Sequence, residues 1–195
     1  FIFAGNDSKG LRYGTILTPE KFFLSWKEDV EDNSRFKLDK YILKLCEPSR
    51  ALELMHDFVL FDKGTKKLPR PHQYHAVKAA QAAILAGEGG IIWNTMRSGK
   101  SIVMDILARW VLETLPQGRI VVVTDRDELD KQIEGVMRNA GVIGADSASP
   151  RVTSRSEFVQ KLGAPSPRLL CALIHKFEPD LTGAPPRVQG RFYIF

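Results

Sequence analysis

The stretch at residues 89–104, GGIIWNTMRSGKSIVM, most strongly limits what this chain can fold into. A short apolar run, IIW, leads into a polar loop that ends in the triplet Gly99–Ser101, and a helical apolar pattern begins directly afterwards. This order of strand, loop and helix is the context in which a G-K-[ST] triplet indicates phosphate binding. The N–H groups of such a loop and the N-terminus of the next helix together attract phosphate. The triplet also occurs by chance, and the two flanking patterns favour the functional interpretation.

Each residue of the loop has an expected role toward a nucleotide. Lys100 is expected to reach the β- and γ-phosphates of ATP as a mobile cation, and the Ser101 hydroxyl to ligate Mg²⁺. These two residues are the expected catalytic residues, and Ser101 is also the expected metal ligand. The residues expected to contact the nucleotide are Thr95, Met96, Arg97, Ser98, Gly99, Lys100 and Ser101.

The composition is that of a globular domain and not of a membrane-spanning chain. Of 195 residues, 44% are hydrophobic and 26% charged, which is ordinary for a soluble domain with a core. The net charge of +5 permits a polyanionic partner without requiring one. Cys46 and Cys171 lack metal-ligand spacing, so we expect reduced core residues of a cytoplasmic protein. There is no apolar run of about 18 residues, which predicts no membrane span. Phe1 is not a start methionine and the chain stops within an apolar run, so we expect a fragment.

The second half of the chain alternates between helical and apolar patterns. Strands separated by helices predict an α/β fold, a parallel sheet with flanking helices, here incomplete and preceded by a small α+β segment. The expected helices cover 71–86, 100–115 and 156–162, with another opened by Asp125, and the expected strands cover 91–93, 120–123, 169–174 and 192–195.

The first 70 residues predict smaller elements. Two short strands surround a turn within residues 1–16, and helices are expected over 37–45 and 48–58. Leu52, Met55 and Val59 are the expected apolar stripe of the second helix. The basic residues between 63 and 70 indicate either a solvated connector or a DNA contact. His72 and His75 lie three apart on one helix face, where helix packing is favoured over a metal site because no acidic or cysteine partner accompanies them.

Several runs together resemble one family. They are LPRPHQYHAVKAA at 68–80, IIWNTMRSGKSIVM, IVVVTDRDELDKQ at 120–132, and the shorter GLRYGT, FFLSWK, DFVLFDK and ALIHKF segments. The combination looks like the motor (R) subunit of type I restriction endonucleases, which are helicase-like, superfamily 2 ATP-dependent DNA translocases. The phosphate loop is shared by many NTPases, whereas RPHQYHAV together with VVVTDRDELD is far more specific.

The resemblance implies a RecA-like P-loop fold and further roles. It implies that residues 1–17 are the tail of an upstream nuclease domain, 18–68 a helical linker and 69–195 the first part of the motor domain. It places Gln73 at the adenine of ATP, and Thr124 and Arg126 at the DNA backbone, with Asp125 capping a helix. The implied cofactors are ATP and Mg²⁺, and the implied partners are double-stranded DNA and the methyltransferase (M) and specificity (S) subunits.

The resemblance further implies that the acidic pair of the motor follows residue 195, so the fragment itself is expected to bind ATP weakly, if at all, and not to hydrolyse it. Two other functions stay open: a nucleotide-binding, non-hydrolysing regulatory module, and a small-substrate P-loop kinase, against which the VVVTDRDELD run argues.

Two positions depart from the full loop pattern G-x-x-x-x-G-K-[ST]. Asn94 replaces the first glycine, and asparagine tolerates a positive φ better than other non-glycine residues. Arg97 stands where helicase-type motors usually carry another glycine. Its side chain is expected either to turn to solvent or to add a second cation near the γ-phosphate, and nucleotide binding tolerates both outcomes better than fast hydrolysis does.

Overall fold

The computed structural model describes residues 1–28, 31, 35–62, 64–125, 127–139, 143–144, 149–177 and 188–195. These residues form two compact units, Phe1–Val103 and Met104–Phe195, with the boundary inside helix α4 (Lys100–Thr114). None of the described helices combines the length and apolar character needed to cross a bilayer.

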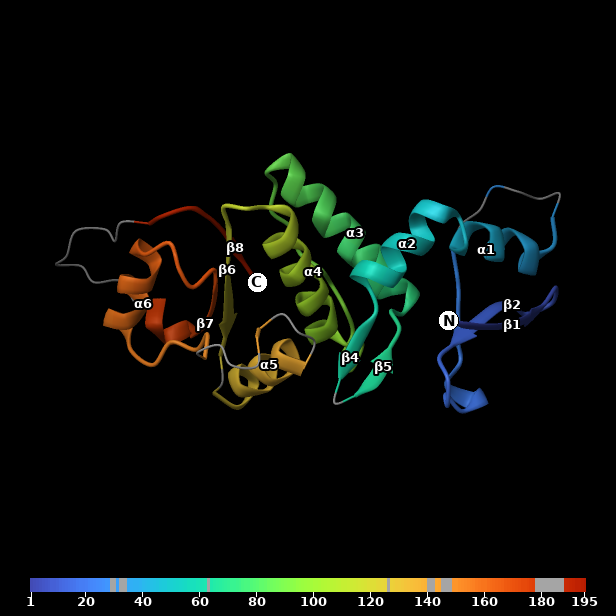
Figure 1. Cartoon of the computed structure of the whole chain (residues 1–195), viewed down its shortest axis with the longest axis horizontal. Helices are drawn as coiled ribbons and strands as arrows, with labels where there is room; N and C mark the ends of the chain where they lie inside the picture. The colour runs from blue at the N-terminus through green and yellow to red at the C-terminus, as the bar shows by residue number, and fades with distance from the viewer. Residues whose placement is uncertain are drawn as a thin grey trace. The chain divides into compact units, whose positions relative to one another are not determined.

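The first unit joins a small sheet to a set of helices (Figure 1). Strands β1 (Ile2–Asn6), β2 (Gly10–Gly14) and β3 (Leu24–Ser25) pair antiparallel in that order. They are followed by α1 (Lys37–Leu45), α2 (Pro48–Asp57), a hairpin of β4 (Leu60–Asp62) and β5 (Thr65–Lys67), and α3 (Pro71–Ala86). A short 3-10 helix, η1 (Glu20–Phe22), precedes β3. The two strands and three helices expected here are confirmed.

An aromatic cluster forms the core beneath the start of α3. The Trp26 ring lies 5.9 Å from that of Tyr13 and 5.6 Å from that of Tyr74, and the Phe58 ring lies 4.9 Å from that of Tyr74. All four side chains are almost fully buried. The Tyr13 hydroxyl donates a hydrogen bond to the Pro69 carbonyl, which fixes the residues just before α3. Burial of this aromatic surface therefore positions the N-terminus of α3.

Helix α3 begins and ends where the sequence predicts. Pro71 is its first residue, a position where the missing N–H costs nothing. Gly87 ends it in the left-handed conformation, with φ of 76°.

Three expectations for residues 1–70 are wrong. Leu52 and Met55 are 65% and 54% exposed, and α2 instead buries Leu54, with Phe58 just beyond its end. The expected pair, Leu52 and Met55, and the buried pair, Leu54 and Phe58, both fit a 3.6-residue period. Only packing against the neighbouring core therefore decides which pair is buried. The basic connector is partly the strand β5, and Cys46 is exposed at the end of α1 rather than in the core.

The second unit holds a parallel sheet. Strand β6 (Gly118–Thr124) lies between β7 (Leu169–Leu173) and β8 (Arg191–Ile194), with Ile120 opposite Leu169 on one side and Tyr193 on the other. Helices α5 (Asp127–Asn139) and α6 (Arg155–Gly163) connect β6 to β7, and the short η2 (Ile174–Phe177) follows β7. The predicted parallel arrangement of these three strands is confirmed.

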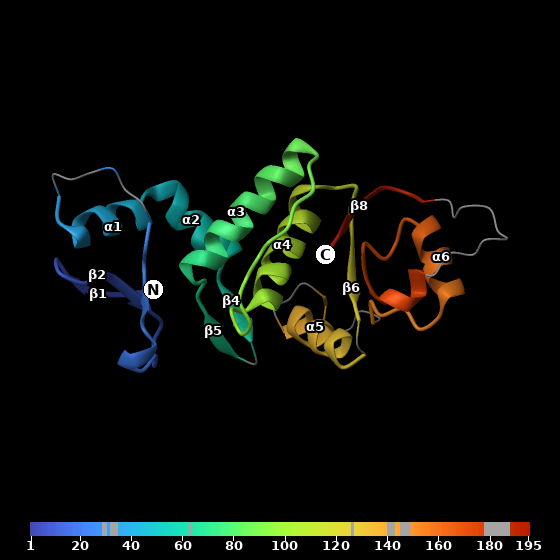
Figure 2. The ribbon, with the colours of Figure 1, turned by 180° about the vertical axis from the view of Figure 1, so that it is seen from behind.

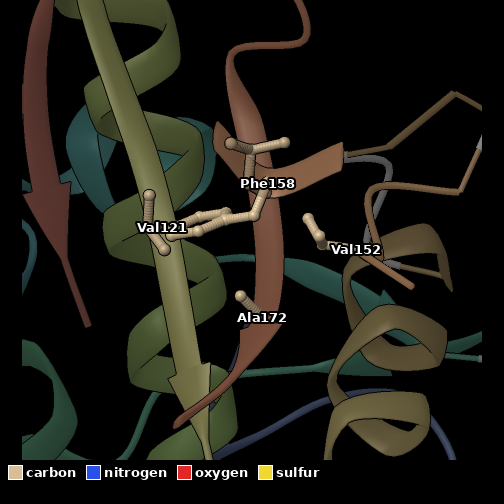
Figure 3. Packing of buried hydrophobic residues seen from close by; sticks show 5 residues of the cluster. Val121, Val152, Phe158 and Ala172 are labelled. Atoms are coloured by element: carbon tan, nitrogen blue, oxygen red, sulfur yellow. The ribbon is translucent and has the colours of Figure 1, made fainter. Parts of the chain in front are cut away.

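One face of β6 and β7 packs against α6. Val121, Leu170 and Ala172 form a cluster with Val152 and with Phe158 of α6. Figure 3 shows the Phe158 ring pointing toward Val121 of β6. Cys171 is fully buried in β7, as expected of a core residue.

The expected strand before the phosphate loop is absent. Residues 88–95 have no regular secondary structure, and Figure 2 shows them as a plain trace between α3 and α4. Ile91 and Trp93 are 89% and 90% exposed. A strand exists only through hydrogen bonds to a neighbouring strand, and none of the described strands pairs with this segment. The prediction of a strand over 91–93 is therefore wrong for this structure.

Candidate nucleotide-binding site

The loop closes onto the first turn of α4. The Ser98 N–H donates to the Thr95 carbonyl at 3.4 Å, which makes a turn. The Ile102 and Val103 N–H groups both donate to the Gly99 carbonyl, at 3.1 and 3.3 Å, and these bonds begin the helix. The triplet thus lies at the junction of loop and helix, as the motif requires.

Gln73 ties the start of α3 to this loop from the inside. The side chain is 2% exposed. Its amide nitrogen donates to the carbonyls of Ser98 and Gly99, at 3.0 and 3.2 Å, and its amide oxygen accepts from the Arg70 N–H at 2.9 Å. Both amide hydrogens are therefore used to hold the loop. This anchoring role was not anticipated from the sequence, which gave Gln73 only a contact to adenine.

His72 supports the same tether. Its Nε2 lies 3.1 Å from the Ser98 carbonyl and donates to it in the tautomer that carries a proton there. The neighbouring His75 ring packs instead against Trp26 and Tyr74, with ring centroids 6.1 and 5.3 Å away. In the described part of the chain neither histidine belongs to a group of metal-ligating side chains. The ring contacts of His75 agree with the helix-packing interpretation, whereas His72 makes a hydrogen bond to the loop.

Gly99 is required by both conformation and space. Its φ is +84°, which side chains rarely adopt, and an added Cβ would lie 2.4 Å from the Gln73 amide nitrogen. The Gln73 side chain fills the space beside the Gly99 Cα, so the loop can pack against the start of α3 only because this residue has no Cβ.

Lys100 lies over the outer side of the loop. Its ammonium donates to the carbonyls of Asn94 and Thr95, at 2.9 and 2.8 Å, and the side chain is exposed. An ammonium has three N–H donors, so one remains for a phosphate oxygen. Ser101, the second residue of α4, is half-buried. One hydroxyl suits Mg²⁺, which usually takes one or two protein oxygens together with phosphate oxygens and water.

The remaining loop residues differ in exposure. Met96 is 89% exposed and Thr95 is also exposed, whereas Ser98 is 7% exposed. The Ser98 hydroxyl is buried and has no hydrogen-bond partner in the described structure.

The strained residue of the loop is Arg97. Its φ is +59°, in the left-handed region, whereas Asn94 does not have a positive φ. Asn94 therefore does not adopt the positive φ that asparagine tolerates. The residue with a positive φ is Arg97, at the position where helicase-type motors usually carry glycine. The Arg97 side chain is exposed, which matches the first of its two expected orientations.

The residues expected to contact DNA lie in the second unit. Thr124 ends β6 and is 5% exposed, with a hydroxyl that has no partner among the described residues. Arg126 lies outside the described residues. Helix α5 follows directly on this stretch of chain, and its described residues begin at Asp127. Hydrogen bonds from Lys131 and then Arg151 hold the pKa of the Asp127 carboxyl below its usual value.

Comparison with known proteins gives consistent matches. The family of SWI2/SNF2 ATPases matches residues 72–192, which include Gln73, the loop and Thr124. The endonuclease subunit of the type I restriction enzyme HindI from Haemophilus influenzae is 32% identical over 148 residues, covering 66% of this chain and 14% of that protein.

More distant relatives cover more of the chain. The corresponding subunit of SauCOLORF180P from Staphylococcus aureus is 23% identical over 190 residues, with 96% of this chain and 19% of that protein covered. The putative MjaIXP subunit from Methanocaldococcus jannaschii is 26% identical over 204 residues, with 88% and 19% covered. The chain therefore spans less than a fifth of the length of these relatives.

Proposed function

Because the chain belongs to the SWI2/SNF2 ATPase family, we propose that it is the ATP-binding part of the R subunit of a type I restriction enzyme. In this proposal the whole subunit couples ATP hydrolysis to translocation along double-stranded DNA and to its cleavage, together with M and S subunits. The observation that carries the proposal is the Gln73 tether. It holds Ser98 and Gly99 in place directly before Lys100 and Ser101, the residues proposed to bind the phosphates and Mg²⁺.

We also propose a division of the chain that follows the resemblance. Residues 1–17 are the end of a nuclease domain, 18–68 a helical linker and 69–195 the first part of a RecA-like motor domain. The described elements of 69–195 include α3, the loop and a parallel sheet, which are elements that such a motor domain contains.

The chain's own residues supply most of the proposed binding chemistry. The remaining N–H donor of Lys100 binds a β- or γ-phosphate oxygen, and the backbone at Gly99 approaches the phosphates closely. The Ser101 hydroxyl ligates Mg²⁺ in this proposal. A bound Mg²⁺ would neutralise part of the charge of the phosphates. Gln73 keeps the loop carbonyls in place, so the loop is organised before the nucleotide arrives.

Two further contacts belong to the proposal. The amide oxygen of Gln73 accepts one hydrogen bond and has a second lone pair, which suits the amino group of adenine. Thr124 and Arg126 are proposed to contact the DNA backbone, where a hydroxyl and a guanidinium both suit phosphate oxygens.

The experiment is Lys100→Ala in the full-length R subunit that carries this segment. We expect ATP hydrolysis and ATP-driven DNA translocation to be abolished, because the described part of the loop offers no second ammonium while its backbone stays intact. Lys37→Ala, which removes an exposed lysine at the start of α1, is the matched control and should keep both activities. Normal translocation by Lys100→Ala would refute the proposed role of the loop.

A second candidate function rests on Arg97. A charged, strained residue where helicase-type motors carry glycine is the observation that favours a regulatory module that binds nucleotide without hydrolysing it. Turnover by the unmodified full-length subunit decides the matter: measurable ATP hydrolysis stimulated by DNA excludes the regulatory module.

A further inference from the structure

A groove of about 690 Å³ lies beside the β4–β5 hairpin, within the first compact unit. One wall is the segment that follows β2 and leads into η1, and the other wall is the hairpin. None of its lining residues belongs to the phosphate loop. We call it the Phe22–Phe61 groove, after the two aromatic side chains that line it.

Large apolar side chains stand unusually exposed in this groove. Ile16 and Leu17 are 75% and 94% exposed, and Phe22 and Phe61 are 61% and 54% exposed. Single exposed apolar residues are common on soluble proteins, but several in one hollow mark a binding surface. The backbone of Leu17 has a φ of +66°, a conformation that side chains disfavour, and it presents a leucine that is almost fully exposed.

The same groove carries positive charge. Lys66 and Lys67 of β5 line it, and the ammonium of Lys21 lies 5.0 Å from the centre of the Phe22 ring. Among the described residues that line the groove there is no aspartate or glutamate. Neither Lys66 nor Lys67 forms an ion pair with another described residue. The charge of the two lysines is therefore available to an anionic partner.

We propose that the Phe22–Phe61 groove binds single-stranded nucleic acid. Lys66 and Lys67 contact phosphates, and the rings of Phe22 and Phe61 stack on unpaired bases. Cationic side chains beside exposed rings are the combination that single strands require, since each nucleotide offers a charged phosphate and a flat apolar base. A duplex keeps its bases stacked inside and has no base face to offer these rings. This inference rests on the proposed function, in which the parent subunit acts on DNA.

The test measures binding of a fluorescent 20-nucleotide oligo-dT to the 195-residue chain by anisotropy. We expect Phe22→Ala and Phe61→Ala each to raise Kd by about tenfold, as loss of one stacked base does. The double variant Lys66→Gln/Lys67→Gln should lower the slope of log Kd against log salt by about 1.4, since each single-strand phosphate contact contributes about 0.7. A 20-base-pair duplex should be insensitive to the two phenylalanine changes.

The matched control substitutions change residues of α1 and the residue directly before it, all outside the groove. Phe36 is 65% exposed outside the groove, so Phe36→Ala should leave Kd unchanged, as should Lys37→Gln/Lys44→Gln. Unchanged oligo-dT affinity in Phe22→Ala and Phe61→Ala would overturn the proposal and leave the groove to an acidic peptide or another protein surface. Lys100→Ala should keep its affinity for oligo-dT. Failure of the proposed function, tested by ATP-driven translocation, is therefore distinguishable from failure of the groove proposal, tested by oligo-dT binding.

Discussion

Replacing Arg97 by glycine should stabilise the chain slightly. Arg97 has a φ of +59°, and a side chain in the left-handed region costs about 1–2 kcal/mol. Glycine removes that cost. It also loses more conformational freedom on folding, which destabilises the folded chain by about 0.5–1 kcal/mol. The net gain lies between about 0 and 1.5 kcal/mol, and its central value of about 0.75 kcal/mol corresponds to a rise in Tm of about 1.5–3 °C for a chain of this size.

Thermal unfolding followed by circular dichroism measures this change. Arg97→Ala is the matched control, because it removes the guanidinium but keeps the Cβ, and its Tm should stay close to that of the unmodified chain. A rise in Tm with alanine as large as with glycine would show that charge, and not backbone strain, limits stability here.

The same substitution tests function. In the full-length subunit we expect Arg97→Gly to keep or raise ATP turnover, because the side chain is exposed and glycine allows a closer approach of the backbone to phosphate. If Arg97→Gly instead cost as much turnover as Lys100→Ala, Arg97 would be a catalytic cation and this account of the loop would be wrong.

Other contacts of the described chain lead to further expectations. Gly99→Ala should cost about 2 kcal/mol or more, because φ is +84° and the new Cβ meets Gln73, whereas Gly89→Ala, with nothing within 4 Å, should be nearly neutral in the same melting experiment. Gln73→Ala should speed amide hydrogen exchange in the loop, since it removes two hydrogen bonds to loop carbonyls, and unchanged exchange would argue against the tether. Hydrogen bonds from Lys161 and then Thr153 lower the pKa of Glu157 to about 2, so stability that is present above about pH 4.5 should be lost as pH falls toward 2. Circular dichroism of Glu157→Gln should show a weaker pH dependence over that range. Binding of duplex DNA by the chain should be weak, independent of sequence and steeply reduced by salt in filter-binding titrations, and a preference for one duplex would contradict this.

Local signals in the sequence determined most of the helices and the strands of the parallel sheet. Pro48 and Pro71 mark the first residues of α2 and α3, and Gly87 marks the end of α3. The expected strand over 120–123 is the central strand β6 of the sheet, between β7 and β8, and nearly all of its residues are buried. These features depend on backbone preferences and on apolar spacing over a few residues, so they can be read without knowledge of the rest of the fold.

The site was only partly readable from the sequence. The triplet Gly99–Ser101 and its place at the start of α4 were predicted from the motif and its flanks. The bonds from Gln73 to two loop carbonyls were not, because residues about 25 positions apart meet only after α3 is placed by the aromatic core beneath it. The location of the strain at Arg97 instead of Asn94 also depends on how the loop closes onto α4.

The expected strand over 91–93 shows most clearly what local sequence leaves open. Its residues have the composition of a buried strand, yet Ile91 and Trp93 are exposed and unpaired. Lys66 and Lys67 show the same dependence on a neighbouring strand. Their sequence indicated a solvated connector, but they belong to strand β5 because β4 lies beside them and pairs with them. A helix satisfies its own backbone, so sequence can fix it locally, whereas a strand requires a neighbour that only the tertiary structure provides.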